Sequence, residues 1–120
     1  MNKYDDVLDL CYDYSAGYEG YMLTHIVVFW LKKELSEEEL TTFEKEVRSL
    51  ENIPSVEQIH VGKPASTKKR AVIDNSYDFC LTVMLRDIAA HDSYQEDPLH
   101  MAFINNCSHM WDRVKIYDAD

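Results

Sequence analysis

The stretch LTHIVVFWL, residues 23–31, carries apolar side chains at nearly every position. Successive side chains of a β-strand point to opposite faces. One face of this strand would therefore present His25, Val27 and Phe29, and the other would present Val28 and Trp30. A strand that is apolar on both faces is covered on both sides in the folded protein. Whatever sheet contains this strand must bury its two faces.

The sequence on the C-terminal side of this strand predicts the order β-α-β-β-α-α-β. The segment SEEEL, residues 36–40, is a capping box, so a helix is expected from Ser36 to about Glu51. Asp97-Pro98 is a second helix start, with Asp97 as the N-cap and proline in the first turn. The remaining elements are expected as strands over 55–62, 77–85 and 114–117 and a short helix over 88–95.

This order predicts an α+β, ferredoxin-like fold, in which a four-stranded antiparallel sheet carries its helices on one face. If the helices cover the His25 face of the first strand, the opposite face is bare in a single chain. Such a patch needs a partner. A second copy packed sheet to sheet would give a homodimeric α+β barrel, with the seam made by Ile26, Val28, Trp30 and Met84.

Length and charge limit the classes of function. A chain of 120 residues is long enough for one core, and we expect a single domain over 22–120 preceded by an acidic, tyrosine-rich extension over 1–21. Twenty-two acidic and twelve basic residues give a net charge of -10, which disfavours nucleic acid and membrane surfaces as partners. With neither a signal peptide nor a long apolar run, a cytoplasmic protein is expected.

Histidine and cysteine spacing gives no sign of a metal or cofactor. The three cysteines are widely separated, and the five histidines form no HExxH or similar tight pattern. We therefore predict no metal site and no cofactor.

His100 is the first candidate site residue. It falls in the first turn of the helix that begins after Asp97, where backbone N–H groups carry partial positive charge. That charge disfavours imidazolium and holds the ring neutral, so His100 is either a poised base or a core residue.

Four segments together resemble the stress-responsive A/B barrel (Dabb) family of small dimeric ferredoxin-like proteins. They are MLTHIVVF over 22–29, HVG over 60–62, YDFCLTV over 77–83 and DSYQEDPLHMAF over 92–103. In the plant polyketide cyclase branch of that family, the reaction takes place in a cavity between helices and sheet. The resemblance implies that His100 and Tyr94 are the catalytic pair, and that His25, Val27, Phe79 and Phe103 line the ligand cavity.

Two positions depart from the cyclase pattern. Phe79 replaces a third-strand histidine, and Asp97 replaces the first histidine of an HPxH segment. Three functions therefore stay open. The first is a family member of undefined activity whose cavity binds a small apolar or aromatic molecule. The second is a cofactor-independent cyclase, isomerase or lyase that uses His100 and Tyr94. The third, with less support, is a monooxygenase-like or haem-binding dimeric barrel.

Overall fold

The computed structural model describes residues 22–120, and the predicted order of elements is confirmed there. The extension expected over 1–21 lies outside the described residues. The strands are β1 (Leu23–Leu31), β2 (Val56–Gly62), β3 (Phe79–Leu85) and β4 (Trp111–Ala119). The helices are α2 (Glu37–Arg48), α3 (Ile88–Glu96) and α4 (Pro98–Cys107), with 3-10 turns η1 (Ser49–Asn52) and η2 (Ser108–Met110).

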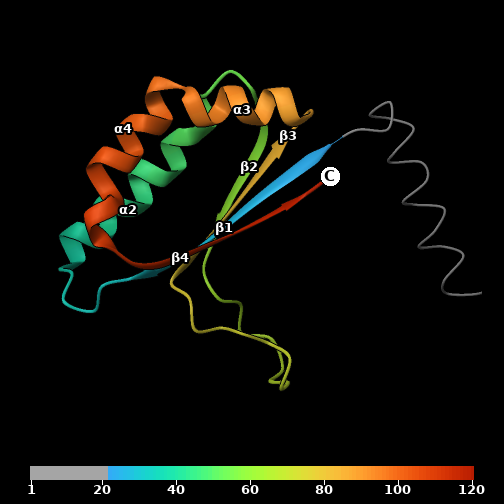
Figure 1. The fold of residues 1–120 in the computed structure, drawn as a ribbon. Coiled ribbons are helices and arrows are strands. Elements are labelled where there is room, and N and C mark those ends of the chain that lie inside the picture. The colour runs from blue at the N-terminus through green and yellow to red at the C-terminus, as the bar shows by residue number, and fades with distance from the viewer. Residues whose placement is uncertain (1–21) are drawn as a thin grey trace, which may run out of the picture.

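The four strands form one antiparallel sheet in the order β2-β3-β1-β4. The helices lie together on one side of this sheet, as Figure 1 shows. This is the ferredoxin-like α+β fold that the sequence predicts. β1 is central, because it pairs with β3 along one edge and with β4 along the other.

Burial alternates strictly along the two central strands. On β1 and β3 every second side chain is buried beneath the helices, while the intervening side chains are only half-buried. Aromatic rings fill the middle of the helix-side core, where Phe43 of α2 packs on Phe29, Phe79 and Phe103 with centroids 5.2–6.0 Å apart. The expectation of a two-faced strand therefore holds: one face is in the core, and the other is apolar and open.

The helix starts follow the predicted capping chemistry. The Ser36 hydroxyl accepts from the Glu39 backbone N–H at 3.1 Å, and the Glu39 carboxylate accepts from the Ser36 N–H at 3.1 Å, which completes the capping box. Asp97 caps α4 by accepting from the Leu99 N–H at 2.8 Å.

The last strand is longer than the sequence suggested. A short strand was predicted over 114–117, but β4 runs from Trp111 to Ala119. Charged residues interrupt its apolar pattern and hide its length, and such residues are typical of an edge strand, where they discourage pairing with other chains. The extra length matters because it places Asp118 directly opposite His25.

Among residues 22–120, no helix combines the length and the apolar character that crossing a membrane requires.

Candidate functional site

Helix α3 presents three polar side chains to the N-terminal part of the central strand β1. Its N-cap, Asp87, accepts from the Ala90 N–H at 2.8 Å and fixes where the helix begins. His91, Tyr94 and Gln95 are spaced i, i+3 and i+4, so they share one helix face. That face lies over His25 of β1, with the His91 ring 5.0 Å and the Tyr94 ring 5.7 Å from the His25 ring, centroid to centroid.

The short break at Asp97-Pro98 brings the next helix against the same side chains. Because α4 starts immediately after α3, His100 in its first turn lies beside Tyr94, with ring centroids 4.9 Å apart. The predicted catalytic pair and His25 are thus in contact through Tyr94. All three are deeply buried, with exposed fractions of 2 % for His25, 1 % for Tyr94 and 8 % for His100.

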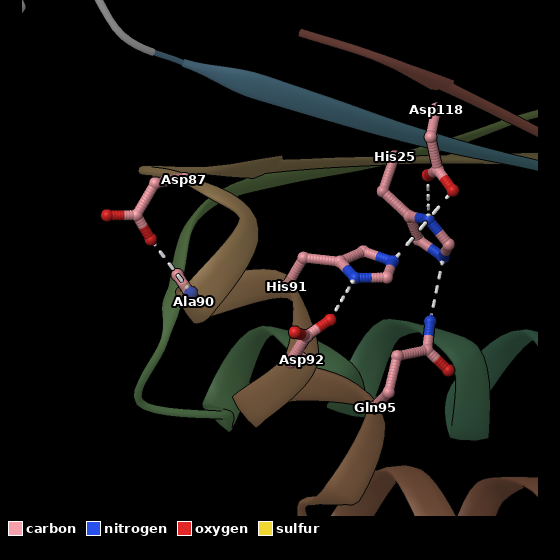
Figure 2. A network of polar contacts seen from close by, with 7 residues as sticks. All are labelled: His25, Asp87, Ala90, His91, Asp92, Gln95 and Asp118. Carbon is pink, nitrogen blue, oxygen red and sulfur yellow. Dashed lines mark hydrogen bonds and ion pairs between the residues drawn. The ribbon is translucent and has the colours of Figure 1, made fainter.

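Figure 2 shows the hydrogen bonds that satisfy His25. Its Nδ1 lies 2.5 Å from Asp118 Oδ1, and its Nε2 lies 3.4 Å from the side-chain amide nitrogen of Gln95. A buried imidazole without partners would cost about 1–3 kcal/mol of folding free energy. The β4 carboxylate and the α3 amide remove that cost, one at each ring nitrogen.

His91 joins this network through contacts with Asp92 and Asp118, as Figure 2 also shows. Its Nδ1 lies 3.1 Å from Asp92 Oδ1, and its Nε2 lies 3.9 Å from Asp118 Oδ2. His25, His91 and Asp118 each offer one ligand-type atom, and these three atoms lie within 4.8 Å of one another. The spacing of histidines in the sequence did not predict this cluster.

Burial controls the protonation of the inner pair. Desolvation lowers the pKa of His100, and the nearby His25 lowers it further, so the ring is neutral at pH 7. Desolvation also raises the pKa of Tyr94, which keeps its hydroxyl protonated and able to donate a hydrogen bond. Nδ1 of His100 is buried and has no hydrogen-bond partner among the described residues.

A surface pocket of about 310 Å³ opens at the outer end of this network. It lies where β1 and β4 meet the start of α3, and His91 and Asp118 form part of its wall. The other lining residues are Leu23, Ile88, Asp92, Ala119 and Asp120. The polar side chains therefore run inward from this pocket through His25 and Tyr94 to His100.

The three apolar residues expected to line a cavity lie deeper in the core. Val27 is buried on β1, two residues beyond His25. Phe79 and Phe103 belong to the aromatic cluster around Phe43. Phe79 also borders a different pocket, of about 440 Å³, between α2 and the strand ends, where the Lys63 ammonium lies 5.4 Å from its ring centroid.

Three residues of the network were not predicted. The sequence could have indicated His91 and Gln95, because their spacing with Tyr94 puts them on one helix face. It gave no indication of Asp118, which lies beyond the predicted end of the last strand. Only the register of β1 and β4 pairs it with His25.

Comparison with known proteins agrees with this geometry at the level of the fold. The family profile for the stress-responsive A/B barrel domain (Dabb) matches residues 23–120. Comparison with curated proteins finds no significant match.

Several solved structures share the fold. A Dabb family protein with a ferredoxin-like fold from Mesorhizobium loti has a TM-score of 0.68 at 24% identity, covering 83% of this chain and 96% of that chain. A dimeric ferredoxin-like protein of unknown function from Thermobifida fusca has a TM-score of 0.67 at 17% identity, with 82% and 90% covered. A hydroxynitrile lyase from Passiflora edulis has a TM-score of 0.70 at 16% identity, with 82% and 92% covered.

Burial of His100 predicts a pH-dependent loss of stability. The native pKa lies below the unfolded value of 6.5, so the unfolded chain takes up this proton first as the pH falls. The free energy of unfolding should decrease below about pH 6.5, and the decrease should be shallower in His100→Gln. Urea denaturation of both proteins from pH 7.5 to 5 measures this. Equal pH slopes in the two proteins would contradict the assignment.

Proposed function

The chain belongs to the stress-responsive A/B barrel domain (Dabb) family, and on that premise we propose that it acts as a homodimer that binds a small apolar or aromatic molecule. The observation that carries the binding part is the row of buried polar side chains His25, Tyr94 and His100 behind the 310 Å³ pocket. Polar groups in a core reduce stability unless they are satisfied, so a row of them at a pocket is typical of a functional site.

The open face of the sheet supports the homodimer. Ile26 lies beside Thr82, Val28 beside Cys80 and Thr24 beside Met84 on the face away from the helices. These side chains are only half-buried in the single chain. A mostly apolar stripe of this kind along two central strands is covered in folded proteins by another layer, and the T. fusca structure with the same fold is dimeric.

Trp30 provides a second argument for a sheet-to-sheet dimer. Its indole lies on the same open face, where the Arg113 guanidinium covers it at 4.5 Å and its Nε1 donates to the Ser76 hydroxyl at 3.0 Å. Tryptophan and arginine are enriched at the centres of protein interfaces, where they contribute most of the binding free energy. We therefore place Trp30 in the dimer seam with Ile26, Val28 and Met84.

The volume and the lining residues of the pocket indicate the size and the charge of the ligand. Its volume of about 310 Å³ lies at the lower end of the usual range for ligand pockets, roughly 300–1,000 Å³. Leu23, Ile88 and Ala119 give it an apolar wall, while three aspartates, Asp92, Asp118 and Asp120, lie around it. These carboxylates repel anions, so we propose a neutral or cationic ligand rather than an acid.

Catalysis is the second candidate function. A neutral His100 beside a protonated Tyr94 has the components for proton transfer next to a carbonyl, and a hydroxynitrile lyase shares the fold. Both side chains are buried behind His25, however, and a base must come within hydrogen-bond reach of the proton that it removes. Their burial supports binding over turnover, with the pocket in front of His91 and Asp118 as the ligand position.

The cytoplasm is the compartment that we propose. Cys80 and Cys107 are free thiols among the described residues. Free thiols are typical of proteins that work in a reducing compartment.

Trp30→Asp should convert the dimer to a monomer. A buried, unpaired carboxylate on the seam of each protomer costs several kcal/mol, which is enough to lower dimer affinity by more than a hundredfold. Sedimentation or light scattering at micromolar concentration measures the change. The matched control is Leu99→Asp, an exposed apolar position on α4 away from the sheet, which should stay dimeric. A soluble Trp30→Asp dimer would refute the sheet-to-sheet arrangement.

Ile88→Trp should block the ligand pocket. Ile88 is 59 % exposed in the first turn of α3 and forms part of the pocket wall, so an indole there fills the pocket without disturbing the core. The probe is the neutral fluorophore N-phenyl-1-naphthylamine. We expect saturable binding of one fluorophore per chain, and we expect Ile88→Trp to weaken it at least tenfold. Leu99→Trp introduces the same indole at an exposed apolar position in the first turn of α4 and should leave binding unchanged. Equal binding by both variants would contradict this site.

A further inference from the structure

We propose that His25, His91 and Asp118 form a binding site for one divalent transition metal ion of the zinc class. The three side chains come from β1, α3 and β4, so only the folded chain brings them together. Two imidazoles and one carboxylate are a common ligand set for zinc and for other first-row divalent ions.

The three ligand atoms lie within 4.8 Å of one another, so small side-chain movements are needed to bring them to the spacing of a bound ion. Metal–ligand bonds of about 2.0–2.2 Å place tetrahedral ligand atoms roughly 3.4 Å apart. Asp118 Oδ2 is 3.9 Å from His91 Nε2, whereas Asp118 Oδ1 is 2.5 Å from His25 Nδ1. The Asp118 side chain is 44 % exposed near the free end of edge strand β4, so it can withdraw from His25 and admit the ion.

His91 is already oriented as a metal ligand. A ligating histidine almost always donates from its second ring nitrogen to a carboxylate, a carbonyl or water, and this bond fixes the tautomer. Nδ1 of His91 lies 3.1 Å from Asp92 Oδ1, so it carries the proton and donates to that carboxylate. Figure 2 shows that Nε2 points toward Asp118 and the His25 ring. In this tautomer Nε2 carries no proton, so its lone pair can bind an ion.

His25 has a matching partner at its second nitrogen. Nε2 lies 3.4 Å from the Gln95 amide nitrogen, and a half-turn of that amide places its oxygen in the same position. With an ion on Nδ1, the neutral ring carries its proton on Nε2 and donates it to the Gln95 oxygen. Binding therefore moves the ring proton from one nitrogen to the other and leaves no buried polar atom of His25 unpaired.

The site has a fourth position that faces solvent. His91 and Asp118 form part of the wall of the 310 Å³ pocket, so the ion is reached from the pocket and can hold water or a ligand there. Three protein ligands with one open position distinguish reactive zinc sites from closed structural ones. Magnesium and calcium are disfavoured, because they prefer all-oxygen ligands.

The metal proposal is tested by titrating the metal-free full-length protein with Zn²⁺ by calorimetry and with Co²⁺ by visible absorption. We expect one ion per chain, and a cobalt spectrum of a four-coordinate site with nitrogen ligands. Excess Mg²⁺ should not displace the ion. His91→Ala should lower affinity by at least a hundredfold, and Asp92→Asn by about 10- to 100-fold through loss of the hydrogen bond that orients His91.

Matched controls separate this site from adventitious binding by other histidines and aspartates. His109→Ala and Asp112→Asn remove the same groups at exposed positions outside the cluster, and both should bind as the unaltered chain does. The proposal would be overturned if the His91→Ala variant bound zinc as tightly as the His109→Ala variant does. A stoichiometry below one zinc ion per chain would also overturn it. Fluorophore binding measured in EDTA tests the proposed function independently of the metal.

Discussion

The structure depends on strand β1, which must bury two different faces at once. As the central strand of the ferredoxin-like sheet, it pairs with β3 and β4 through its backbone, so neither edge is free. Its side chains alternate between a core filled by three helices and an open apolar face. The helices cover only the face that lies in the core. A second copy of the chain would cover the open face without any additional element, so a homodimer is the simplest arrangement for a domain of this size.

The polar end of β1 follows from the same geometry. His25 occupies a position of the buried face, so the fold must supply partners for both ring nitrogens, and it takes them from β4 and α3. Asp87 and Asp97 fix where α3 and α4 begin. These helix starts therefore set the positions of His91, Tyr94 and His100 around His25. One buried histidine thus organises a polar row that extends from a surface pocket into an otherwise apolar core.

The sequence predicted the parts of this account that arise from local patterns. The two-faced strand, the capping box and the Asp97-Pro98 helix start are short-range signals, and each was confirmed. The structure also brings Tyr94 into contact with His25 and His100, while their role as a site stays a prediction. The role of Asp118 was not predictable, because a charged edge strand has no apolar period and its register with β1 joins residues 93 positions apart. For the same reason, the sequence did not predict the cluster of His25, His91 and Asp118.

The reactivity of Cys80 tests the central claim most directly, because its thiol lies on the open face beside Val28. The rate of alkylation of Cys80 is read by peptide mass spectrometry, which separates it from the other cysteines. If β1 buries its second face against another copy, alkylation is slow in the native protein and at least tenfold faster in Trp30→Asp. Equal, fast alkylation of both proteins would contradict the account, since it would leave the open face of the sheet uncovered.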